Sequence, residues 1–418
     1  MGNALNLSGI ALTTDQGKWR RLAAKLSKEV LAPRAAEVDR TGAFPRESIK
    51  ALGEAGLMGL TIPKEYGGPG GNILTTTFII EELAKGCAST SMVYTMHITS
   101  VPILIALCSP EQRKMFLEPI AKGEMLIAVA MTEPGSGNRL WHMDSFAAEE
   151  NGHFIIDSFK SFATSCGEAD YYLVPLRDNA NVGPTELSLF MVDGKDKNVK
   201  PIGVWDGMGL RGNSSRPVHF DKCIVPPINR LGLPTQGHSM MFAYTLPIYQ
   251  CGLSANYLGI AQSAFDVAKN HVEKRIHSDT KTALSTLETI QRYIAEMHVR
   301  LDQARHLVYR VSQMADNAVV LFDEFREHDL LDEIIRANPD DPFFVECAQI
   351  KIAACEMAID VTNKAIQVCG GSGYKRGHLA EMAYRNARAG SVMGPSDDAL
   401  KLIIGRQILG LPQPWELQ

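Results

Sequence analysis

Apolar positions divide the 418-residue chain into three blocks. From about residue 14 to 127 they recur at three- and four-residue spacing, which predicts amphipathic helices with a break at Pro33. Between about 128 and 232 the apolar runs are short and separated by Gly, Asn, Asp and Pro, which predicts an antiparallel β-barrel or sandwich. The helical spacing returns from about residue 239. This order predicts an α+β chain with an N-terminal helical domain (1–127), a β domain (128–235) and a C-terminal four-helix bundle (236–418).

Two segments stand out within the helical blocks. The stretch TTTFIIEELAKGCASTSMVYTMHITSVPILIALCS, residues 75–109, is apolar and rich in small residues, and it predicts a buried helical hairpin. The acidic segment LFDEFREHDLLDEIIRANPDD, residues 321–341, interrupts the last block. Because runs of like charge are usually solvated, we expect it to be a surface insertion.

Composition excludes several classes of protein. With 42 basic and 47 acidic residues the net charge is −5, which argues against binding to duplex nucleic acid, since phosphates require a basic face. The eight cysteines are scattered without a CxxC pair, which predicts reduced, buried thiols and neither disulfides nor a metal site. We found no uninterrupted apolar run long enough to span a membrane, and residues 1–16 lack the features of a signal peptide. We therefore expect a soluble cytoplasmic protein.

Three glycine-bearing segments are candidates for ligand contact. They are MTEPGSGNRL from Met131, GMGLRGNSS from Gly207 and QVCGGSGY from Gln367. None has the lysine of a P-loop or the strand-to-helix setting of a Rossmann glycine motif. Taken singly, each is explained by a tight turn.

Together with their flanks, these segments resemble the acyl-CoA dehydrogenase family of flavoproteins over nearly the whole chain. The similar stretches are FPRE, LGEAGLMGLTIPKEYGG, AMTEPGSG, IDSFKSFATSCGEADYYLV, GLRGNSS, QVCGGSGY and YRNAR. The resemblance implies FAD bound between the domains and usually a homotetramer. It also implies an acyl thioester substrate, carried by CoA or by an acyl carrier protein, with an electron-transfer flavoprotein or dioxygen as electron acceptor.

The resemblance also assigns site residues. The segment from Met131 to Asn138 supplies donors to the flavin, and Thr132 is the first contact. The segment from Phe162 to Thr164 lies along the ring, with Thr164 near N5, and Arg275 reaches the pyrophosphate from a neighbouring subunit. The full set of implied FAD contacts is Met131, Thr132, Gly137, Asn138, Phe162, Thr164, Arg275, Gln291, Gln367, Gly370, Gly371, Ser396 and Asp398. The implied substrate contacts are Asn138, Arg139, Tyr249, Gln250 and Gly394. Asn138 and Arg139 stand where the family usually has a Ser-Asp dipeptide. Arg139 either binds an anionic group of the substrate or is simply solvated.

The carboxylate that removes the α-proton in the family is missing from both of its usual positions. One position holds Gly394, and the other holds Tyr249 followed by Gln250 in place of the usual arginine. Three replacements are candidates. Asp398 is a carboxylate, but it is equally explained as an acid in the first turn of a helix, where it complements the helix dipole. Tyr249 has an intrinsic pKa near 10, which makes it a poor base. His97 could act as a base near neutral pH unless it is buried.

Three functions therefore remain open at this point. The first is α,β-dehydrogenation of an acyl thioester with a displaced base. The second is flavin chemistry without that base, either monooxygenation or elimination of a sulfinate-type group, because family members of both sorts lack the glutamate. The third is a catalytically silent partner subunit.

Overall fold

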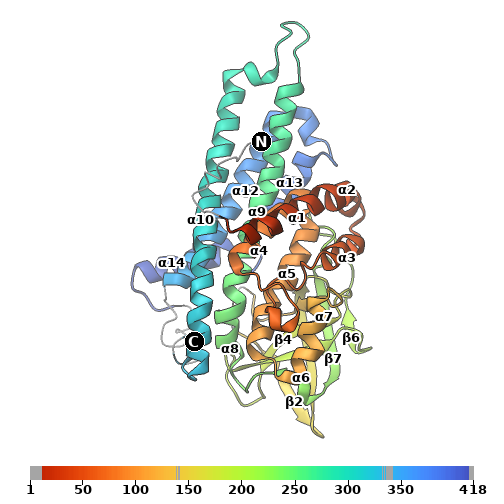
Figure 1. The fold of residues 1–418 in the computed structure, drawn as a ribbon, viewed down its shortest axis with the longest axis vertical. Helices are drawn as coiled ribbons and strands as arrows, with labels where there is room; N and C mark the ends of the chain where they lie inside the picture. Colours follow the sequence, from red (N-terminus) through yellow and green to blue (C-terminus); the bar gives the residue numbers. More distant parts are fainter. Residues whose placement is uncertain are drawn as a thin grey trace.

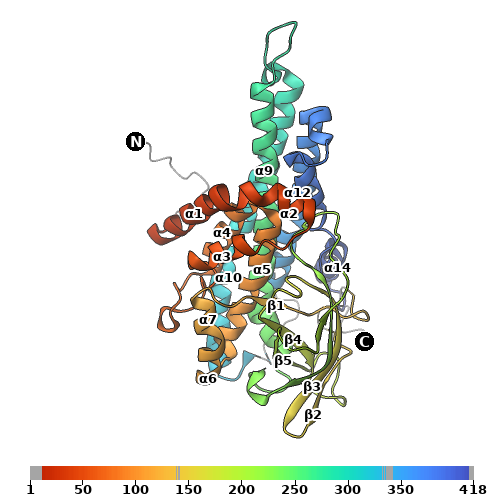
Figure 2. The same cartoon turned by 90° about the vertical axis from the view of Figure 1, so that its right-hand side faces the viewer.

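The computed structural model of the protein describes residues 12–137, 139, 142–331, 333, 335 and 342–413. Helices form the N-terminal region, strands form the middle and longer helices form the C-terminal region, as the sequence pattern predicts (Figures 1 and 2). All eight cysteines are free and buried, in agreement with the prediction.

The N-terminal helices begin at a strong capping signal. Thr13 and Gln16 form a capping box at the start of α1, and a π-helical turn joins α1 to α2. Pro33 lies in the first turn of α2, where its missing N–H is tolerated, so the helix continues through the predicted break. The elements are α1 (Thr14–Leu26), η1 (Ser27–Leu31), α2 (Ala32–Thr41), α3 (Arg46–Glu54), η2 (Lys64–Tyr66), α4 (Ile73–Gly86), α5 (Ala88–Leu107), α6 (Pro110–Gln112), η3 (Arg113–Leu117) and α7 (Glu118–Ala121).

Helices α4 and α5 form the predicted buried hairpin, with Cys87 between them. By length and apolar composition alone α5 could cross a membrane, contrary to our reading of the sequence, but most of it is buried inside the molecule. A buried core helix passes the same test, so α5 is weak evidence for a membrane span. Glu81 of α4 is also buried, and its carboxylate accepts hydrogen bonds from Arg305 Nε, at 3.0 Å, and from the Tyr309 hydroxyl.

The β domain consists of two four-stranded sheets. One sheet has the order β1-β4-β5-β8 and the other has the order β2-β3-β7-β6. The pairings between these strands are antiparallel except that of β1 with β4, which is parallel. This parallel pair departs from the predicted antiparallel arrangement. The strands are β1 (Ile127–Val129), β2 (Ala147–Glu150), β3 (His153–Ala163), β4 (Tyr171–Arg177), β5 (Leu187–Asp193), β6 (Val199–Pro201), β7 (Arg216–Val225) and β8 (Arg230–Leu231). The short helix η4 (Pro227–Asn229) lies between β7 and β8.

Burial explains how the two sheets are oriented. Strands β4 and β5 are buried on both faces, whereas β3 alternates between buried and exposed positions. Tyr172 and Phe190 point into the core between the sheets, while Leu173 and Leu189 join the core of the helices. The β1-β4-β5-β8 sheet is therefore the layer that lies between the helical domains and the outer sheet.

Helix α9 is the central helix of the C-terminal region and packs against α4, α5, α10, α12 and α13 (Figure 1). A Cβ atom at Gly259 would lie 2.3 Å from the Glu81 carbonyl oxygen, so glycine is what allows α9 to approach α4 this closely. The elements are α8 (Gly237–Met240), η5 (Met241–Thr245), α9 (Leu246–Lys274), η6 (Leu284–Thr286), α10 (Glu288–Glu327), α12 (Pro342–Tyr374), α13 (Leu379–Arg388) and α14 (Asp397–Ile408).

The acidic segment is not a simple surface insertion, and the prediction for it was wrong. Helix α10 continues through residues 321–327, and Phe322, Leu331 and Ile335 are buried in the core. Its apolar residues dock onto the bundle, and charge density alone does not reveal this. Residues 332, 334 and 336–341 of this segment lie outside the described part of the chain.

Candidate active site

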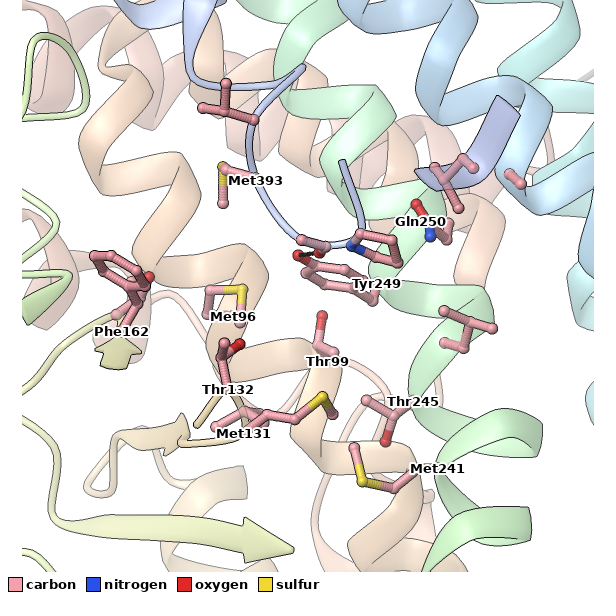
Figure 3. Close-up of a pocket in the computed structure, with 18 of the residues that line it drawn as sticks. Met96, Thr99, Met131, Thr132, Phe162, Met241, Thr245, Tyr249, Gln250 and Met393 are labelled. Carbon is pink, nitrogen blue, oxygen red and sulfur yellow. Dashed lines mark hydrogen bonds between the residues drawn. The ribbon is translucent and has the colours of Figure 1, made fainter. Parts of the chain in front are cut away.

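A cavity of about 530 Å³ lies where the β domain meets the helices. Its wall comes from α5, the loop after β1, the end of β3, the stretch from α8 to the start of α9, the start of α12, and the loop between α13 and α14. Figure 3 shows Met131, Thr132 and Phe162 separated from Thr245, Tyr249 and Gln250 by the cavity. The predicted flavin contacts Met131, Thr132 and Phe162 therefore line one space with Tyr249 and Gly394, the two positions of the missing base.

The loop after β1 is held by a buried ion pair. Lys160 Nζ lies 2.9 Å from Glu133 Oε1, and the other carboxylate oxygen accepts the backbone N–H groups of Asp144 and Ser145 at 2.6 and 3.1 Å. Burial opposes ionisation of Glu133, but the Lys160 ammonium outweighs it and the pKa of the carboxyl is lowered. The charged pair fixes the turn that follows Thr132.

The residues on the β-domain side of the cavity fit a flat, polar ring such as that of FAD. The Phe162 ring is 58% exposed although it lines the cavity, so one aromatic surface is left for stacking. Thr132 and Thr164 bring hydroxyl groups to the same side, and a Cβ atom added at Gly137 would meet nothing within 4 Å. Met131, Thr132, Gly137, Phe162 and Thr164 would hold the ring. Asn138 lies outside the described residues.

The opposite wall is one face of a continuous helical segment. Its cavity-lining residues follow helical spacing: His238, Met241, Phe242, Thr245, Leu246, Tyr249 and Gln250. Spacings of three and four residues on a helix are ordinarily signs of a core-facing apolar stripe. Here the stripe carries polar side chains into a cavity.

The loop between α13 and α14 completes this wall. The Tyr249 hydroxyl donates to the Gly394 carbonyl oxygen at 2.7 Å, and the fully buried Lys351 donates to the carbonyl of Pro395 at 3.0 Å. The same ammonium lies 2.7 Å from Asp397 Oδ1. Helices α9 and α12 thus fix the loop on which the family places its glutamate.

Among the described residues that line the cavity there is no Asp, Glu, Lys or Arg. Burial raises the pKa of the Tyr249 phenol, so this hydroxyl stays protonated and acts as a donor. The described part of the wall therefore lacks a carboxylate base, and His238 is the histidine among its lining residues.

His97 is a wrong candidate for the base. It is fully buried outside the cavity wall, its Nε2 lies 3.0 Å from the Met58 carbonyl oxygen, and its Nδ1 accepts the Ile127 N–H at 3.1 Å. Burial lowers its pKa to about 4. Both ring nitrogens are used to join α5 to β1, so His97 has a structural role.

Asp398 and Ser396 do not line the cavity either. Ser396 caps α14 by accepting the Ala399 N–H at 3.3 Å, and Asp398 is exposed in the first turn, where an acid complements the helix dipole. The sequence allowed either a catalytic role for Asp398 or a role at the start of a helix, and the structure shows the second.

The remaining predicted contacts also lie away from the cavity wall. The Arg139 guanidinium donates to the Gly135 carbonyl oxygen at 3.2 Å. The other residues are exposed, on the hairpin between α9 and α10 or near the end of α12; they are Arg275, Gln291, Gln367, Gly370 and Gly371. The resemblance implies that Arg275 contacts FAD bound to a neighbouring subunit. The structure of a single chain does not test this, so the contact stays a prediction.

Sequence reasoning missed much of the wall. Met96 and Thr99 of α5, Trp205 before β7, Thr245, and Phe344 of α12 all line the cavity. The helical spacing from residue 238 to 250 was the available signal for Thr245. Lys351 gave no signal, because one lysine in an apolar helix is ordinary in sequence.

Two helical regions around a β domain, with a cavity offering an aromatic surface and hydroxyl donors, fit a flavin-dependent oxidoreductase. The comparisons agree. The acyl-CoA dehydrogenase N-terminal, middle and C-terminal domain models match residues 13–124, 128–223 and 251–392. The chain belongs to the acyl-CoA dehydrogenase family, which confirms the predicted fold class, enzyme class and FAD cofactor.

Individual relatives cover almost the whole chain. The short-chain specific acyl-CoA dehydrogenase of Clostridium acetobutylicum is 29% identical over 95% of this chain and 98% of its own. Butyryl-CoA dehydrogenase from Megasphaera elsdenii has a TM-score of 0.85 at 25% identity, covering 96% and 99%. A chain from a study of the electron transferring flavoprotein of Acidaminococcus fermentans also has a TM-score of 0.85, at 27% identity with the same coverage.

Proposed function

We propose that this protein is an FAD-dependent oxidoreductase that dehydrogenates an acyl thioester carried by CoA or by a carrier protein. The observation that carries the proposal is the single cavity that joins Thr132, Phe162 and Thr164 to Tyr249 and Gly394. Met131, Thr132, Gly137, Phe162 and Thr164 would hold FAD, which would supply the chemistry of hydride acceptance. The apolar wall excludes water and accommodates an acyl chain between the two sides.

The chain's own residues have separate tasks in this proposal. Thr132 and Thr164 present hydroxyl donors on the cofactor side, where negative charge develops during reduction. Tyr249 and Lys351 hold the loop around Gly394 against the substrate. The proton acceptor is displaced from both positions where the resemblance predicts a glutamate.

The second candidate is elimination of a sulfinate-type group from a β-substituted acyl thioester. The absence of Asp and Glu from the described cavity wall favours it, because such a reaction proceeds without the missing carboxylate. Both candidates use the same cofactor and the same carrier. They differ in whether the flavin becomes reduced.

Anaerobic addition of acyl-CoA thioesters to the purified holoprotein separates the candidates. Dehydrogenation bleaches the flavin absorbance and yields the enoyl thioester. Release of the sulfur of a β-sulfino thioester as sulfite, with water supplying one oxygen to the sulfur and the proton of the new C–H bond, and without bleaching, would replace the proposed reaction by the second. Turnover that requires an external reductant and dioxygen would contradict both.

The assembly and location are proposals of the same kind. A homotetramer is supported by the family resemblance, and an electron-transferring flavoprotein as acceptor is supported by the similar chain in the Acidaminococcus fermentans study. A cytoplasmic location is supported by the eight free thiols. Light scattering of the holoprotein and reoxidation by such a flavoprotein test the first two.

A further inference from the structure

On the cavity-facing side of the helical segment, Thr245 and Gln250 each carry a buried polar atom that has no hydrogen-bond partner in the described part of the chain. The two atoms are Oγ1 of Thr245 and Oε1 of Gln250, on side chains that are 5% and 1% exposed. Both residues line the cavity, on either side of Tyr249 along the segment (Figure 3).

Two neighbouring hydroxyl groups in the wall have hydrogen-bond partners. The Thr99 hydroxyl donates to the Thr95 carbonyl oxygen at 2.7 Å, and the Tyr249 hydroxyl donates to Gly394 at the same distance. The great majority of buried polar atoms in proteins are paired, and each unpaired atom carries a desolvation cost. Thr245 and Gln250 are therefore exceptions that a bound group would explain.

The charge of the wall limits what that group can be. The described lining residues include no Asp, Glu, Lys or Arg, so a carboxylate on the acyl chain would meet no permanent positive charge and an ammonium would meet no negative charge. A hydroxyl, oxo or amide group has no such penalty. It also offers the donor or acceptor that a threonine hydroxyl and a glutamine amide recognise.

We propose that the acyl group of the substrate carries a neutral hydrogen-bonding substituent, recognised by Thr245, by Gln250 or by both. This inference rests on the proposed function and adds the class of acyl group to it. The substituent lies on the acyl chain, on the α9 side of the cavity and away from Phe162. The rest of the lining selects an apolar chain around it.

Two near-isosteric variants test this recognition. Thr245→Val and Gln250→Met each remove the polar atoms and keep most of the side-chain volume. Thr99→Val is the matched control, because it removes a hydroxyl that already has a partner. The holoprotein is titrated with an unsubstituted acyl-CoA and with analogues hydroxylated at each carbon beyond the β-carbon, and binding is read from the flavin spectrum.

We expect the wild type to bind at least one hydroxylated analogue on the order of tenfold more tightly than the unsubstituted thioester. At least one of the two single variants, Thr245→Val and Gln250→Met, should remove this preference. The Thr99→Val control should keep it. Equal binding of all analogues by the wild type, or a preference that survives both variants, would overturn the inference.

Thermal unfolding of the variants in the absence of thioester tests this inference separately from the proposed function, because it requires no reaction. Thr245→Val should leave the melting temperature unchanged or raise it, because it removes an unpaired hydroxyl, whereas Thr99→Val should lower it. If Thr245→Val destabilises the protein as much as Thr99→Val does, the Thr245 oxygen is satisfied within the protein and the inference fails. Failure of every thioester to bleach the flavin would instead contradict the proposed function.

Discussion

The hydroxyl of Tyr249 donates a hydrogen bond to the carbonyl oxygen of Gly394 at 2.7 Å, across 145 positions of sequence. These are the two positions where the family resemblance predicts a catalytic glutamate. Their contact explains why either position can serve, because a carboxylate on α9 or on the loop would reach the same part of the cavity. In this chain the contact holds the wall together instead.

Restoring a carboxylate to the loop should restore a base. Gly394→Glu places an acid beside Tyr249, and the backbone of Gly394 does not have the positive φ that would require glycine. We expect faster flavin reduction by acyl-CoA thioesters, by a factor on the order of 10²–10⁴, the usual contribution of general base catalysis. Stopped-flow absorbance measures the rate, and Gly394→Gln is the uncharged control. A folded Gly394→Glu protein with no gain would indicate that another base already operates.

Tyr249→Phe tests whether the phenol braces the wall or transfers a proton. Because burial raises its pKa, the phenol is neutral throughout the accessible pH range, and we expect it to act only as a brace. The variant should lose about 1 kcal/mol of unfolding free energy, the usual contribution of one hydrogen bond, and keep the pH profile of flavin reduction. Loss of one limb of that profile would assign proton transfer to Tyr249.

The buried pair of Lys351 and Asp397 should contribute more than an exposed pair of similar geometry. Lys351→Met leaves Asp397 charged and unpaired, which we expect to cost about 3–5 kcal/mol. Denaturant unfolding measures the loss. Adding Asp397→Leu should recover part of it, and Lys401→Met, which breaks the exposed pair with Glu356, should change stability little. Equal effects of the two lysine variants would contradict this account.

Gly370 interrupts α12 with φ 61° and ψ −146°, a conformation close to the region that only glycine adopts readily. Gly370→Ala should therefore cost about 1–3 kcal/mol. Gly371→Ala is the neighbouring control, because Gly371 has no positive φ and a Cβ atom there would meet nothing within 4 Å. Thermal unfolding of both variants should show a loss only for Gly370→Ala, and equal melting temperatures would show that the kink does not require glycine.

Local spacing predicted the three-part architecture because it reports which side chains each element buries. The resemblance pointed to Thr132, Phe162 and Thr164, which line the cavity; their contacts with FAD stay a prediction. Spacing could not reveal the contact between Tyr249 and Gly394, since it depends on how α9 packs against a distant loop. The acidic segment was misjudged for the same reason: the burial of Phe322 is a property of the folded bundle.

His97 should make stability depend on pH. Its folded pKa is lowered to about 4 by burial, whereas an unfolded histidine titrates near 6.5, so between these values the unfolded chain binds more protons. The free energy of unfolding should therefore be fully present above about pH 6.5 and fall as the pH drops toward 4, by up to about 3 kcal/mol from this residue. His97→Gln should lower stability at neutral pH, because it disturbs the bonds to Met58 and Ile127, yet flatten the slope between pH 6.5 and 4. His219→Gln, at a more solvent-exposed histidine on β7, should leave that slope unchanged. Denaturant unfolding at several pH values gives the slopes, and parallel curves for the wild type and His97→Gln would assign the acid sensitivity to other groups.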